Sequence, residues 1–136
     1  RLGRERGRRH LSSARMRALH ETWAWVAIAA TGLVGAWGLV LARRKQEPGR
    51  PFWVAMGAAT VIMLAQVGLG VYLIAAEGLQ PGDQHVFYGF LIAFTFAFAY
   101  IYRAQMSRRP ALSYGLLLLF VMGLGIRCVY TWGVDF

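Results

Sequence analysis

The sequence predicts an all-α integral membrane protein, a four-helix bundle with an Arg-rich N-terminal extension. The 136 residues are 57% hydrophobic and 15% charged, and the charges fall in a few clusters, which is typical of membrane proteins. Between the clusters lie four charge-free runs of 21, 26, 19 and 17 residues, at 22–42, 51–76, 84–102 and 110–126. A helix needs about 20 residues to cross roughly 30 Å of hydrocarbon. Its backbone N–H and C=O groups hydrogen-bond to each other within the helix, as lipid requires, so these runs are predicted to be helices.

Residues 1–19 form the basic extension, which contains seven Arg and one Glu. Such a segment cannot bury an apolar core and alone would be disordered. We expect it to become ordered on acidic headgroups or, in preference, on a partner protein. Met16 resembles a start, and the residues before it would then be an extension held by that partner. The net charge of +9 is therefore assigned to Arg facing headgroups and partners, not to nucleic-acid binding.

Residues 20–136 form the transmembrane domain, with helices expected over about 20–42, 52–76, 84–102 and 111–131. The first helix is expected to begin at about Ser13, with Ser12 or Ser13 as its N-cap. Its glycines recur every three residues and predict a face for close helix approach; they are Gly32, Gly35 and Gly38. In the second helix Pro51 favours the first turn. Its Gln66 is expected to hydrogen-bond a neighbouring helix, with a ligand contact as the less favoured alternative.

The third helix follows a Pro81-Gly82-Asp83 turn and is densely aromatic. Eight aromatic residues occupy its span: Phe87, Tyr88, Phe90, Phe94, Phe96, Phe98, Tyr100 and Tyr102. They cover every face of a helix, which predicts contacts with lipid or a partner subunit. The fourth helix qualifies as a span if Arg127 lies near a membrane face.

The loop charges predict an orientation. The loops after the first and third helices contain seven basic residues, whereas the loop between the second and third has none and carries Glu77 and Asp83. Basic loops stay in the cytoplasm, so we expect both termini outside the bacterial cytoplasmic membrane. The Arg-rich extension favours the opposite orientation, and we follow the loops.

Two histidines are the candidate cofactor ligands. The first and third helices start on the same side, which places His20 and His85 at one membrane face, and two facing imidazoles are the ligands of a six-coordinate b-type haem. Gly89, one turn from His85, would leave room for the porphyrin edge, and Arg127 would neutralise a propionate. The alternative is that both histidines lie at headgroup level without a ligand and that Arg127 snorkels or pairs with Glu77.

Other classes of site are excluded or disfavoured. A single cysteine, Cys128, excludes an internal disulfide and a CxxC redox pair, and no Cys, His and carboxylate cluster has zinc spacing. A small multidrug antiporter would need a carboxylate in mid-helix, and no charge lies inside the first three spans. Polar residues are too few for a channel, and hydrolytic triads are absent. We therefore expect no enzyme activity from this chain by itself.

A family resemblance supports the histidine hypothesis. The stretch MLAQVGLGVYLIAAEGLQPGDQHVFYGFLIAF resembles one four-helix half of the haem A synthase family, where a Q-x-x-L-G helix is followed by a short loop and a histidine. Gln66, Leu69 and Gly70 match that pattern, His85 falls at the place of the second haem ligand, and His20 falls near the first. The resemblance covers about residues 18–105 and implies a haem-holding bundle. It does not imply the synthase reaction, because the paired cysteines are missing and Glu21 follows the histidine instead of preceding it.

The function expected first is that of a small accessory subunit of a larger bacterial membrane complex for electron transfer, respiratory or photosynthetic. Its partners would be other membrane subunits, bound through the basic extension and the small-residue and aromatic helix faces, together with lipids. The alternatives are a b-type cytochrome that binds haem through His20 and His85, and a pigment-binding subunit in which a single histidine ligates a chlorin.

Overall fold

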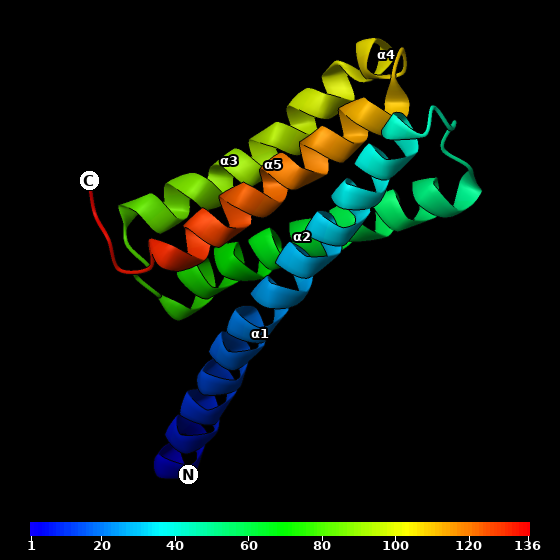
Figure 1. The fold of residues 1–136 in the computed structure, drawn as a ribbon. Helices are drawn as coiled ribbons and strands as arrows, with labels where there is room; N and C mark the ends of the chain where they lie inside the picture. The colour runs from blue at the N-terminus through cyan, green and yellow to red at the C-terminus, as the bar shows by residue number, and fades with distance from the viewer.

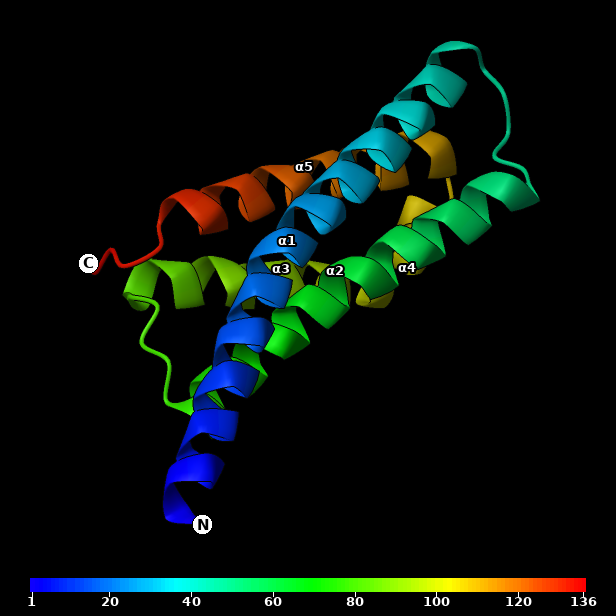
Figure 2. The same ribbon diagram turned by 90° about the horizontal axis from the view of Figure 1, so that it is seen from below.

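The computed structural model describes residues 1–136 and is all-helical, without strands. Its helices are α1 (Leu2–Arg43), α2 (Arg50–Glu77), α3 (Asp83–Ile101), α4 (Arg103–Met106) and α5 (Pro110–Tyr130). All except the one-turn α4 are long and apolar enough to cross a membrane, by length and composition. The expected bundle of four candidate spans is confirmed, and Figures 1 and 2 show it from two sides.

The four long helices pack as a ring in which each touches two neighbours. The most extensive contact joins α1 to α5, followed by α1 with α2, α3 with α5, and α2 with α3. Because α1 and α3 share no extensive contact, they lie diagonally across the bundle. A residue of α1 and a residue of α3 can therefore meet only through the bundle interior.

The first helix is much longer than the sequence predicted. It begins at Leu2, not at Ser13 or residue 20, and runs without a break past the two serines expected as N-caps. Residues 1–19 contain no proline and many good helix formers, so a helix nucleated by the apolar span can extend backward through them. The extension projects beyond the other helices (Figure 1), and nearly all of its side chains are exposed.

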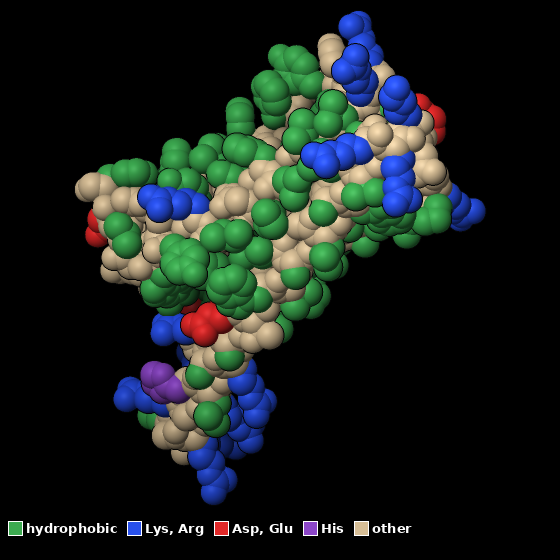
Figure 3. All heavy atoms as spheres, in the orientation of Figure 1, with side chains coloured by type: hydrophobic (Ala, Val, Ile, Leu, Met, Phe, Trp, Pro, Cys, Tyr) green, Lys and Arg blue, Asp and Glu red, His purple; other side chains and the backbone are tan.

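The other ends of the long helices lie within two residues of the expected positions. Pro51 occupies the first turn of α2, as expected. The residue that caps the end of α2 is Gly78, whose φ of 66° lies in the left-handed region that glycine favours. Lys and Arg side chains gather mainly at the end of the bundle that carries the α1–α2 loop and α4, and along the projecting part of α1. Hydrophobic side chains cover the surface between these two regions (Figure 3).

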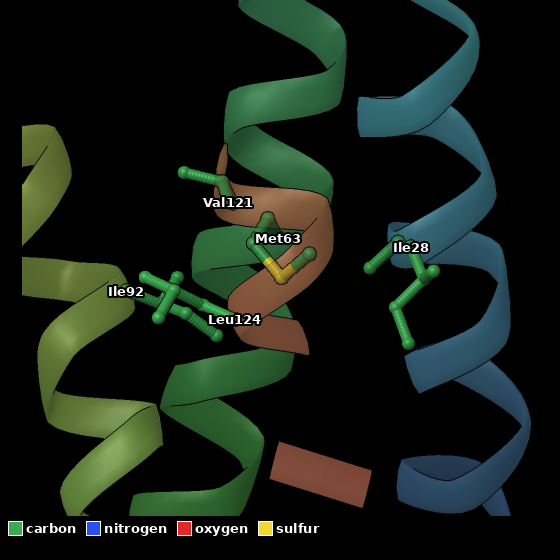
Figure 4. Packing of buried hydrophobic residues seen from close by; sticks show 6 residues of the cluster. Ile28, Met63, Ile92, Val121 and Leu124 are labelled. Carbon is green, nitrogen blue, oxygen red and sulfur yellow. The ribbon is translucent and has the colours of Figure 1, made fainter. Parts of the chain in front are cut away.

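The core is small and central. Its cluster takes residues from all four long helices (Figure 4): Ala27, Ile28, Met63, Ile92, Val121 and Leu124. Only 22 of 136 residues are buried, although 57% are hydrophobic. Most apolar side chains therefore point outward, as they do in helices that face lipid or a partner.

The predicted small-residue face of α1 packs against α5 inside the chain. A Cβ atom added to Gly38 would lie 2.8 Å from the Cα of Gly115, and one added to Gly35 would lie 3.0 Å from the Gly115 carbonyl oxygen. The two backbones are thus in direct contact, which only glycine permits. Close helix approach is confirmed, and this part of the face is not open to another subunit.

Candidate cofactor-binding site

The imidazoles of His20 and His85 meet across the interior of the bundle. Their ring centroids are 6.2 Å apart and their planes are inclined by 67°. His20 comes from α1 and is 9% exposed, whereas His85 comes from the first turn of α3 and is half-buried. The structure therefore brings together the two residues that the sequence placed only at a common membrane face.

His85 is held by α5. Its Nδ1 lies 2.8 Å from the carbonyl oxygen of Cys128, and the Cys128 thiol donates in return to the His85 carbonyl at 3.4 Å. The ring of Trp132 meets the His85 ring edge-on, with centroids 5.0 Å apart. A carbonyl oxygen only accepts, so Nδ1 carries the proton and the lone pair of the neutral ring lies on Nε2. The imidazole is thus oriented in the way that metal-bound histidines are.

His20 is held by α2. The Gln66 amide donates to the His20 carbonyl at 2.8 Å, which confirms the interhelical hydrogen bond expected for Gln66. The His20 ring lies against Gly70, where a Cβ would come within 3.1 Å of Cε1. The Nδ1 atom of His20 and the Oε1 atom of Gln66 are buried without partners. His20 Nε2 is 3.5 Å from the Gln66 nitrogen, longer than an ordinary hydrogen bond.

A cavity of about 780 Å³ surrounds both rings, within the size range of cofactor sites. Its polar groups lie at the histidine end of the bundle and come from Arg17, His20, Glu21, Gln66 and His85, whereas most of the remaining lining is apolar. The core residues Ile28, Met63 and Ile92 close it toward the bundle centre. Gly89 lines the cavity and has open space where a side chain would stand.

Arg127 lies on a different face from the cavity. Its Nε donates to the Tyr88 hydroxyl at 3.4 Å, its guanidinium lies 5.8 Å from the centre of the Tyr88 ring, and it does not line the cavity. Successive helical residues differ by about 100° in direction, so Arg127 points away while Cys128 faces His85. Of the predicted site residues, Arg127 is the one that the structure does not bring to the two histidines. Arg17, one turn before His20, lines the cavity instead.

Sequence reasoning missed Arg17, Cys128 and Trp132 as parts of this site. Arg17 could have been predicted from the sequence, because it stands three residues before His20 and residues three apart in a helix share a face. Cys128 could not, because its contacts with His85, through the backbone carbonyl and the thiol, depend on how α5 is rotated against α3. Trp132 lies beyond the end of α5, and only the path of the chain after Tyr130 brings it to His85.

The two imidazoles fit haem better than a metal ion bound by protein ligands alone. No group of three or more His, Cys, Asp or Glu side chains converges to hold an ion. A haem iron needs only two axial ligands from the protein. Two imidazoles on opposite sides of one metal, with bonds of about 2.0–2.1 Å, have ring centres roughly 6 Å apart, which agrees with the observed 6.2 Å.

Comparison with known proteins identifies no relative: no family model matches the chain, and neither do curated proteins or solved structures. The resemblance to a haem A synthase half stays a prediction from the sequence. The candidate site is defined by its geometry alone.

Proposed function

We propose that this chain is a small integral subunit of a bacterial membrane electron-transfer complex and that it binds a b-type haem between His20 and His85. The observation that carries the proposal is the 6.2 Å separation of the two imidazoles beside a cavity that all four long helices line. Haem bound there would supply a one-electron carrier. The four apolar helices support a place in the bacterial cytoplasmic membrane.

The protein groups divide the work of holding this cofactor. His85 offers Nε2, because its other nitrogen donates to Cys128. His20 offers a ring whose nitrogens have no close partner. Arg17 supplies positive charge at the polar end of the cavity, where it would pair with a propionate, and the apolar lining would keep water from a bound macrocycle. The two haem ligands would thus come from α1 and α3, and α2 and α5 would orient them.

The surface supports membership in a larger complex. Phe90, Phe94, Phe98 and Tyr102 form a ladder along one side of α3, with successive ring centroids 6.1, 6.1 and 4.4 Å apart. All four are exposed within this chain. The Arg-rich part of α1 is likewise exposed. Since Gly35 and Gly38 are occupied by α5, we assign partner contacts to the aromatic ladder and the basic extension, with lipids on the remaining faces.

A reduced-minus-oxidised spectrum of the protein purified from its native membrane tests the proposal. The expected result is a haem b α-band that is lost in His20→Ala and His85→Ala. The matched control is His10→Ala, since His10 lies in the exposed extension and its replacement should leave the band unchanged. Absence of the band, or its persistence in both site variants, would overturn haem binding. A chlorin spectrum that depends on one histidine would assign a pigment instead.

A further inference from the structure

The N-terminus of α3, which carries His85, has no cap of its own. The N-cap residue is Gly82, and no side chain within the helix bonds to its first turn. The first four N–H groups of any α-helix lack intrahelical partners and must find acceptors elsewhere. An uncapped first turn frays, and His85 is only two residues beyond the first helical residue, Asp83.

The missing acceptors come from the C-terminal segment, residues 132–136. The Asp135 carboxylate accepts from the N–H of Asp83 at 2.9 Å, 52 residues away in sequence. The Val134 carbonyl accepts from the N–H of Gln84 at 3.0 Å, and the Gln84 side chain donates to the Asp135 carbonyl at 3.3 Å. A carboxylate at this position is also favoured by the helix dipole.

The C-terminal segment is fixed to the turn before α3 by close packing. The N–H of Gly133 donates to the Pro81 carbonyl at 2.7 Å. Gly82 has a φ of 89°, and a Cβ atom there would lie 2.7 Å from the Val134 nitrogen. Gly82 is therefore required both by its backbone conformation and by the approach of the segment.

Two aromatic contacts extend this attachment to the side chains of α3. Trp132 meets the His85 ring edge-on at 5.0 Å, and Phe136 meets Phe87 in the same way at 5.6 Å. The segment thus contacts the backbone of the first turn and the imidazole together.

We propose that residues 132–136 act as a clamp that sets the orientation of His85, with Asp135 and Trp132 as its positioning residues. The clamp caps the helix that carries the ligand and packs on the ligand itself. Its effect on a cofactor rests on the proposed haem function, whereas its effect on the first turn of α3 does not. Outer contacts of this kind typically change the affinity for a bound metal group 10- to 100-fold.

Asp135→Ala tests the clamp, with Glu47→Ala as the matched control because Glu47 is an exposed carboxylate in the loop between α1 and α2. In Asp135→Ala we expect haem dissociation to become about tenfold faster and a share of the haem to lose its second axial ligand in the optical spectrum. Asp135→Asn keeps an oxygen at the same place and should restore most of the wild-type behaviour. Glu47→Ala should behave as wild type.

Amide hydrogen exchange over residues 83–90, measured without added haem, gives a second readout. Loss of the cap should speed exchange there about tenfold in Asp135→Ala, and Trp132→Ala should alter the haem spectrum with less effect on exchange. If Asp135→Ala and Glu47→Ala show the same rate of amide exchange over residues 83–90, the clamp proposal is wrong, whether or not haem binds. If wild type binds no haem but exchange responds as expected, the clamp holds and the haem proposal fails.

Discussion

The imidazole of His20 in α1 lies directly against the backbone of Gly70 in α2: a Cβ atom at position 70 would stand 3.1 Å from Cε1 of the ring and 3.7 Å from Nε2. We predict that Gly70→Val pushes the ring out of its place. Overpacking of this kind costs about 1–3 kcal/mol, so the free energy of unfolding in detergent should fall by that amount. The haem band should weaken in the same variant.

The matched control for this substitution is Gly68→Val. Gly68 lies in the same helix and has nothing within 4 Å of the added Cβ position. It should leave both the spectrum and the stability near wild type. Equal effects of the two substitutions would mean that valine disturbs α2 itself and that contact with His20 does not matter.

Gln66→Leu should remove the hydrogen bond from the Gln66 amide to the His20 carbonyl, 2.8 Å long. Interhelical hydrogen bonds in membrane proteins contribute about 0.6 kcal/mol on average and at most about 1.7 kcal/mol, so we expect a loss of roughly that size in the free energy of unfolding. We also expect a shifted haem spectrum, because the segment that carries His20 is then less firmly placed.

Trp23→Phe is the comparison for Gln66→Leu, since the Trp23 indole donates to the Ile62 carbonyl at 3.0 Å and also joins α1 to α2. It should cost a similar free energy and leave the haem spectrum unchanged. A spectrum that responds equally to both substitutions would contradict a specific role for Gln66 at the site.

Gly115→Val should separate α1 from α5. A Cβ atom at position 115 would lie 3.0 Å from the Gly35 carbonyl oxygen and 3.1 Å from the Gly38 carbonyl carbon, and these backbone atoms cannot move aside without moving the helix. We expect a destabilisation of about 3 kcal/mol, at the upper end of overpacking costs, measured by thermal or denaturant unfolding in detergent. Gly123→Val, in the same helix with open space around it, should cost far less.

The orientation in the membrane can be measured by labelling with an impermeant maleimide in intact cells, in a Cys128→Ala background. Gln46→Cys and Gln80→Cys place the label in exposed loops at opposite ends of the bundle. The basic loops predict a cytoplasmic position for residue 46, so Gln80→Cys alone should be labelled from outside. Labelling of Gln46→Cys alone would reverse the orientation and make the Arg-rich extension cytoplasmic.

Much of the architecture could be predicted because the evidence for it is local. The length of a charge-free run translates into helix length at a fixed rise per residue, so the bounds of α2, α3 and α5 were expected within two residues. The start of α1 at Leu2 was not. Composition predicts whether a polar segment can fold alone, but here the segment continues a helix that is already formed.

The sequence by itself determined that the chain forms four apolar helices and that His20 and His85 lie at the same end of them. It also determined that glycines on α1 allow a neighbouring helix to approach closely. Only the tertiary structure decided that α1 and α3 lie diagonally, so that His20 and His85 meet at 6.2 Å. It also placed Arg17 at the cavity, turned Arg127 toward Tyr88, and returned Asp135 to the start of α3. The physical reason is that these contacts depend on how each helix is rotated about its axis and where the chain runs afterward, and a rotation of one residue, about 100°, exchanges the side chain that faces the interior.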